Sequence, residues 1–95
     1  MSNDLKKFDV SDYLTDNESI AEYLNAAIEE GDQELLMAAI ADIAKATGMQ
    51  AIASSSGLGR ESLYKALAPG AKPRFETVYR ILQALGVKLT MTPQP

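Results

Sequence analysis

The sequence predicts an all-α domain of five helices, followed by one short C-terminal β-strand. Three observations indicate this fold class. Ala and Leu are abundant, apolar residues recur at helical spacing in five stretches, and glycine or proline separates these stretches. A chain of 95 residues has room for one hydrophobic core, so we expect a single domain over residues 1–95.

Two amphipathic helices are expected in the acidic N-terminal part, residues 1–47. After a polar lead-in expected to dock on the domain, Thr15 and Glu18 have the spacing of a capping box. Apolar residues then follow at i, i+3, i+4, i+7 and i+8 over residues 20–28, which is one face of a helix. A Gly-Asp turn at 31–32 ends this helix and caps the next, so the two helices should pack as neighbours.

Two shorter helices are expected next, over residues 49–55 and 60–68, with a Pro- and Gly-containing loop over 69–73. A final helix is expected over 74–85. The apolar side chains that should point inward from it are Phe75, Val78, Tyr79, Leu82 and Leu85.

Residues 87–92 alternate apolar and polar side chains, and this alternation predicts a short strand. A lone strand has unpaired edges, and a second copy of the same chain is the simplest partner for it. We therefore expect a homodimer.

Charge is distributed unevenly along the chain, although the net charge is −4. Residues 1–42 hold eleven acids and two bases, whereas residues 43–95 hold seven bases and two acids. This asymmetry suggests two surfaces with different partners.

The composition argues against several classes of protein. The chain has no Cys and no His, which removes disulfides, most zinc sites and His-based catalysis. We expect no enzyme activity, no catalytic residues, no metal and no cofactor. The chain also has no apolar run of about 20 residues and no signal-peptide core, so we expect a cytoplasmic protein and no membrane partner.

Residues 49–68 have the pattern of a helix-turn-helix. Ala53 supplies the small residue where the two helices meet, and Gly57 supplies a residue tolerant of positive φ in the turn. Apolar residues at 52, 58, 63 and 66 would hold the pair against the core, and the second helix would present its other face to the DNA major groove. Short amphipathic helix pairs also occur in helical bundles that bind no DNA.

Eight residues on this predicted surface are candidates for contact with double-stranded DNA. They are Gln50, Arg60, Glu61, Ser62, Tyr64, Lys65, Lys72 and Arg74. Gln50 is placed for a phosphate, and Lys72 and Arg74 extend the basic rim.

Alternatives stay open for the second helix of the pair. Arg60 could read a guanine or contact a phosphate, and Lys65 could reach either a base or a phosphate. Tyr64 could pack against a neighbouring helix, and Glu61 could read a cytosine or pair with Lys65 at i+4.

The sequence resembles the addiction-module antidote family, the HigA-like antitoxins of bacterial toxin–antitoxin pairs. The stretches that carry the resemblance are Phe8 to Leu14, Ile20 to Ala27, Ile43 to Ala46 with Gly48-Met49, Gly57-Leu58 with Arg60 to Leu67, and Thr77-Val78 with Ala84 to Val87. Two positions depart from the family pattern: Gly59 stands where a capping Ser is frequent, and Ala51 where Gln is common.

The resemblance implies a lambda-repressor-like, Cro/repressor-type helix-turn-helix fold, a basic RelE/HigB-type toxin as partner, and repression of the operon that encodes both proteins. An acidic segment near residues 9–34 could attract such a toxin, or it could be only a solvated face. A stand-alone repressor without a toxin, and an adaptor that has lost DNA binding, are the other functions to consider.

Overall fold

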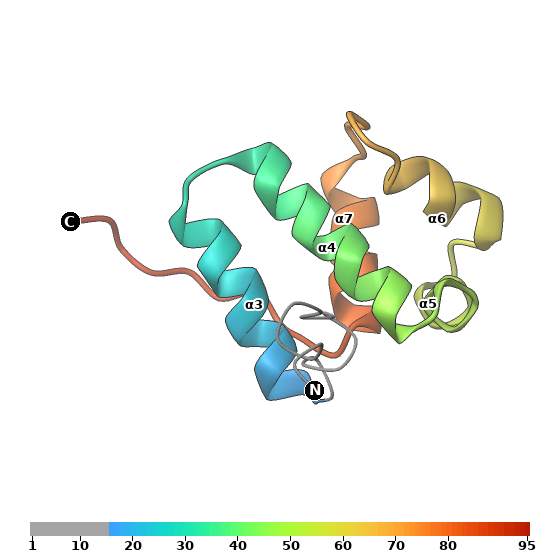
Figure 1. Ribbon diagram of the computed structural model, residues 1–95, viewed down its shortest axis with the longest axis horizontal. Helices are drawn as coiled ribbons and strands as arrows, with labels where there is room; N and C mark the ends of the chain where they lie inside the picture. Colours follow the sequence, from blue (N-terminus) through green and yellow to red (C-terminus); the bar gives the residue numbers. More distant parts are fainter. Residues whose placement is uncertain (1–15) are drawn as a thin grey trace, which may run out of the picture.

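The computed structural model describes residues 16–95, and this range contains five α-helices. They are α3 (Asn17–Glu29), α4 (Gln33–Thr47), α5 (Met49–Ser56), α6 (Arg60–Ala66) and α7 (Phe75–Ala84), as Figure 1 shows. Within residues 16–95, the prediction of an all-helical fold with five helices is confirmed. The docking expected of the polar lead-in concerns residues outside the described range.

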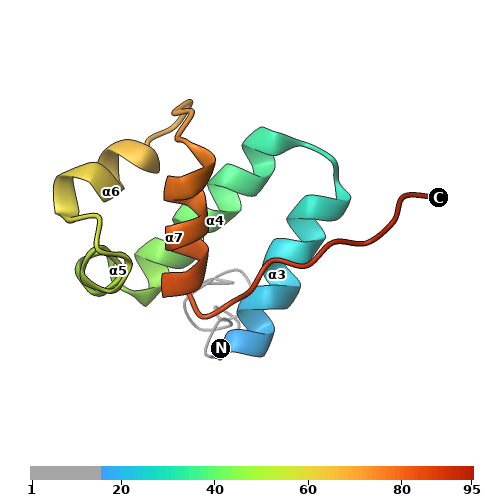
Figure 2. The ribbon, with the colours of Figure 1, turned by 180° about the vertical axis from the view of Figure 1, so that it is seen from behind.

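The helices pack around one hydrophobic core. α3 and α4 pack as a hairpin, α4 contacts α5, and α5 contacts both α6 and α7. Figures 1 and 2 show α7 lying across α4, with α3 at one end of the molecule and α6 at the other.

Within residues 16–95, no single helix has the length and apolar content of a membrane span. α4 and α5 meet such a test only when joined, and the chain bends by 106° between them.

Aspartates begin the first two helices of this range. The Asp16 carboxylate accepts a hydrogen bond from the Ser19 backbone N–H at 2.8 Å, and this bond lowers the pKa of Asp16. The predicted Thr15 cap is therefore wrong by one residue, because the adjacent Asp16 is the stronger capping residue and occupies the N-cap position. Asp32 caps α4 as predicted, accepting from the backbone N–H groups of Glu34 at 2.9 Å and Leu35 at 3.4 Å.

The core takes its largest fully buried side chains from four helices. These side chains are Ile40, Ile43, Ile52, Leu63 and Ile81. Each belongs to the same apolar cluster, so α4, α5, α6 and α7 are held by one continuous interior. On α3, Ile20, Leu24 and Ala27 are buried, whereas Ile28, expected on that face, is 46 % exposed.

The predicted inward face of α7 is wrong in part. Phe75 is 68 % exposed and Tyr79 is 43 % exposed, while Ile81 is fully buried. α7 turns the stripe containing Ile81 and Leu82 toward the interior, and this stripe is rotated away from Phe75 and Tyr79. The two aromatic rings lie beside each other on the surface, with their centroids 6.0 Å apart.

The predicted strand over 87–92 is absent from the described residues. The expected alternation is present, because Val87 and Leu89 pack against the core while Lys88 and Thr90 are exposed. A strand also requires a hydrogen-bonded neighbour, and the one backbone bond of this segment runs from the Val87 N–H to the Leu82 carbonyl, at 3.2 Å, within the described residues. Residues 87–92 therefore form an irregular segment that passes alongside α3 (Figures 1 and 2).

Candidate nucleic-acid interface

The candidate site is built on the corner between α5 and α6. Gly57 ends α5 in the left-handed conformation, with φ of 76°, as the sequence pattern required. Two residues later, the Gly59 N–H donates to the Ala53 carbonyl at 3.4 Å. Ala53 itself is buried, so a small residue does lie where the two helices meet.

Ser56 stabilises this corner from inside. Its hydroxyl donates to the Ala53 carbonyl and accepts from the Leu58 backbone N–H, each at 3.3 Å, and the residue is buried. This role of Ser56 was not predicted from the sequence. The signal was a Ser directly before the turn glycine, because a hydroxyl there can replace backbone partners that the ending helix no longer supplies.

Replacing Ser56 with alanine is expected to lower the free energy of unfolding by about 1 kcal/mol, because the Leu58 N–H loses its partner. Chemical denaturation followed by circular dichroism measures the change. Ser55→Ala is the matched control, since Ser55 is exposed and should leave stability nearly unchanged. Equal stability of the two variants would contradict this role for Ser56.

Gly59 occupies the N-cap position of α6, with φ of 84° and no side-chain cap. An L-residue would be strained at this φ, so the backbone explains why the capping Ser expected at this position is replaced by glycine. The first N–H groups of α6 consequently receive no side-chain cap.

The exposed face of α6 carries most of the predicted contact residues. Arg60, Glu61, Ser62, Tyr64 and Lys65 are all exposed, while Leu63 and Ala66 on the other face are buried. α6 is thus anchored to the core by one face and presents the other to solvent.

Arg60 and Tyr64 are brought together on that face. The Arg60 guanidinium carbon lies 5.5 Å from the centre of the Tyr64 ring, a cation–π arrangement one helical turn apart. Tyr64 is 48 % exposed, so it supports Arg60 along the helix surface instead of packing fully against a neighbouring helix.

Glu61 and Lys65 form no ion pair with each other in the structure. The salt bridge found within residues 16–95 joins Arg80 to Glu76 on α7, at 3.4 Å. Lys65 is therefore available to an anionic ligand.

The three remaining candidates lie around this face. Gln50 is exposed in the first turn of α5, a helix without a side-chain N-cap. Arg74 is exposed at the N-cap of α7. Lys72 lines a hollow of about 620 Å³ between α4 and the α6–α7 loop, together with Asp32, Glu34 and Asp42. Its surroundings are thus more acidic than those of the α6 face.

The α6 face offers a guanidinium, an ammonium group, hydroxyls and an aromatic ring. The guanidinium, the ammonium group and the hydroxyls donate hydrogen bonds to phosphates and to base edges. No group of three or more acidic side chains within residues 16–95 is arranged to hold a metal ion.

Comparison with known proteins gives a match along nearly the whole chain. A family model described as "Probable addiction module antidote protein" matches residues 4–93. A protein of Haemophilus influenzae (strain KW20 / Rd), described as uncharacterized, is 43 % identical over 88 residues, which are 93 % of this chain and 91 % of that protein. No solved structure matches the chain.

Proposed function

Because the chain belongs to the family of probable addiction module antidote proteins, we propose that it is the antitoxin of a type II toxin–antitoxin system that represses its own operon and neutralises a RelE/HigB-type toxin. In this role it is a cytoplasmic regulator and not an enzyme. The observation that carries the DNA-binding part is the α5–α6 corner, which anchors α6 by Leu63 and leaves Arg60 and Lys65 exposed.

In this proposal, α5 and α6 act as a helix-turn-helix and α6 enters the major groove. Arg60, at the start of α6, contacts base edges, and its stacking on Tyr64 limits the conformations that it must lose on binding. Lys65, Gln50 and Arg74 contact phosphates, and Lys72 extends this rim. Glu61 and Ser62 complete the set on the α6 face.

Specificity requires more than one recognition helix. α6 has seven residues, so at about 1.5 Å per residue it is roughly 10 Å long and covers few base pairs. We propose a homodimer whose two α6 helices read half-sites about 34 Å apart, one turn of the duplex.

The acidic net charge is compatible with this function because of where the acids lie. Residues 16–42 contain eight acids and no bases, and they form α3 and most of α4, whereas Arg60, Lys65 and Arg74 belong to the other half of the chain. A polyanion approaching α6 therefore meets the basic half first.

A gel shift with the DNA upstream of the chain's own gene tests the repressor function. With about six phosphate contacts per dimer, binding should weaken by roughly 10³-fold between 50 and 200 mM salt, because each contact releases counterions. An affinity independent of salt would contradict the proposed face.

A pull-down with the tagged full-length chain in its native host tests the antitoxin function. We expect a small basic protein to co-purify, encoded beside the chain's own gene. DNA binding without such a protein would indicate a stand-alone repressor. Co-purification of such a protein without DNA binding would indicate an adaptor.

A further inference from the structure

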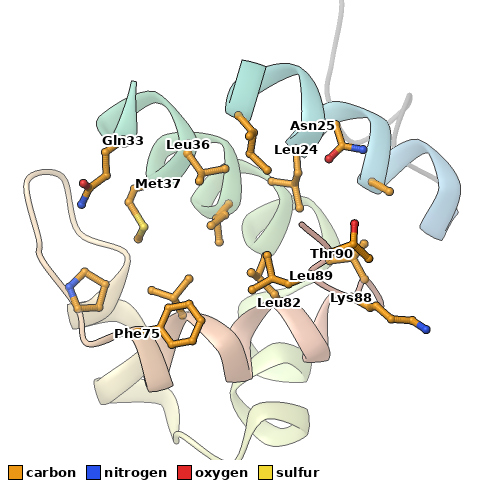
Figure 3. A pocket seen from close by; sticks show the side chains of 16 residues that line it. Leu24, Asn25, Gln33, Leu36, Met37, Phe75, Leu82, Lys88, Leu89 and Thr90 are labelled. Carbon is orange, nitrogen blue, oxygen red and sulfur yellow. The ribbon is translucent and has the colours of Figure 1, made fainter. Parts of the chain in front are cut away.

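An apolar groove of about 400 Å³ lies on the side of the molecule formed by α3, α4, α7 and residues 87–90. In Figure 3, Leu24 of α3 and Leu36 and Met37 of α4 face Phe75 and Leu82 of α7, with Leu89 at one end. Lys88 is the one charged residue among the described residues that line the groove.

Part of the apolar lining of the groove is exposed at its rim. Ile28 on the α3 side is 46 % exposed, and Phe75 on the α7 side is the most exposed aromatic side chain of the described residues, beside the half-exposed Tyr79. A contiguous exposed apolar surface of this kind is typical of a protein-interaction site.

A line of carboxylates borders the groove along α3. Glu18, Glu22 and Glu29 are all exposed, and their i, i+4, i+11 spacing places them on one stripe of the helix. At 100° per residue, this acidic stripe lies directly beside the stripe of Ala21, Asn25 and Ile28, which lines the groove. An occupant of the groove therefore has a row of negative charges along one side.

We propose that this groove is the docking site for a basic amphipathic segment of a protein partner. Apolar side chains of that segment fill the space between Leu36, Leu82 and Phe75, and its Lys or Arg residues pair with the acidic stripe. The identification of the partner as the toxin rests on the proposed function; the chemistry of the groove does not.

Charge complementarity favours this occupant over a second copy of the chain. A second copy carries the same net charge of −4 and the same acidic stripe, so its approach to this face is opposed by like charge. A basic segment is attracted by the same field.

Fluorescence anisotropy with a defined probe tests the groove. The probe is a labelled amphipathic helical peptide of leucine and lysine, and its counterpart carries glutamate in place of lysine. The full-length chain should bind the lysine peptide at least about tenfold more tightly than the glutamate peptide.

Two pairs of variants, each with a matched control, locate the binding. Glu22→Lys with Glu29→Lys should weaken lysine-peptide binding by about tenfold, whereas Glu30→Lys with Glu34→Lys makes the same change in net charge away from the groove and should have little effect. Phe75→Ala should also weaken it by about tenfold, whereas Tyr64→Ala removes an exposed aromatic ring from α6 and should not. Equal effects of a variant and its control would show non-specific attraction and overturn the proposal.

Two further outcomes would show a different occupant and overturn the proposal. If the wild-type chain sediments as a dimer and Phe75→Ala sediments as a monomer, a second copy fills the groove. If an amine-reactive cross-linker joins Lys7 to Lys88 and the peptide does not compete, the chain fills its own groove.

The same variants separate this proposal from the proposed function. Peptide binding requires neither DNA nor toxin, so its failure leaves the gel-shift and pull-down results unaffected. Once the small basic protein has been purified, Phe75→Ala should lose its binding and retain operator binding. Tyr64→Ala should retain binding of the basic protein.

Discussion

Replacing Arg60 and Lys65 together with alanine is expected to weaken operator binding by about two to three orders of magnitude. One bidentate arginine–guanine contact discriminates by roughly 1–3 kcal/mol, and a dimer loses two such contacts with two phosphate contacts. The fold should be retained, because both side chains are exposed and neither contributes to the core. A gel shift at fixed salt measures the affinity, and thermal unfolding verifies the fold.

The matched control for this double variant is Lys45→Ala with Lys88→Ala. It removes the same positive charge from exposed positions outside the α5–α6 corner, and it should change operator affinity by a few-fold at most. Similar losses in the two double variants would mean that binding follows total charge. Unchanged operator binding by the Arg60 and Lys65 variant would show that the α6 face does not contact the operator.

Arg60→Lys distinguishes base reading from phosphate contact within the same experiment. Lysine keeps the charge and loses the planar, two-pronged donor geometry. If Arg60 reads a base, this variant binds the operator and a scrambled duplex with similar affinity. If Arg60 contacts a phosphate, the Arg60→Lys variant still binds the operator more tightly than the scrambled duplex.

Replacing Leu63 with alanine is expected to destabilise the fold by about 2–5 kcal/mol, a large part of the roughly 5–15 kcal/mol that stabilises a small domain. Leu63 is fully buried and attaches α6 to the core, so its truncation leaves a cavity where α6 is held. Urea denaturation measures the loss.

Leu35→Ala is the control for Leu63→Ala. Leu35 is exposed on α4, and its truncation should cost less than about 1 kcal/mol. Operator binding should fall with Leu63→Ala even below its unfolding temperature, because α6 loses its support. Full operator affinity in a destabilised Leu63→Ala protein would show that α6 is not the reading element.

The helices were predictable from sequence because local signals mark their ends. Asp32, Gly57 and the Pro69–Pro73 loop each act within a few residues, and each lies where the sequence placed it. The cap of α3 was misplaced by one residue because Thr15 and Asp16 are adjacent capping residues, and the capping-box spacing favoured Thr15 although Asp is the stronger cap.

The orientation of α7 could not be predicted in full from local pattern. Its sequence contains two overlapping apolar stripes, one through Phe75 and Tyr79 and one through Ile81 and Leu85. Tertiary packing against the core, with α5 as a main neighbour of α7, selects between them and buries the second stripe. The prediction of a strand at 87–92 was wrong for a related reason. Alternation determines which side chains are buried, but a strand also needs a hydrogen-bonded neighbouring strand, which this segment lacks in the described residues.

The candidate site shows the same limit. The exposure of the α6 face follows from the periodicity of Leu63 and Ala66. In the structure this face is exposed, as predicted. The hydrogen bonds of Ser56 and the stacking of Arg60 on Tyr64 depend on how the α5–α6 corner is built in three dimensions, and composition and spacing do not determine them.

The placement of α3 and α6 at opposite ends gives the molecule a permanent electric dipole (Figure 1). In the field of a nucleic acid, such a dipole experiences a torque that turns the α6 end inward before any contact is made, so encounters in the wrong orientation are rejected early. The same alignment leaves α3, which forms one wall of the groove, pointing away from the duplex. A ternary assembly of operator, antitoxin and a basic third component would then be layered, with opposite charges meeting at both junctions.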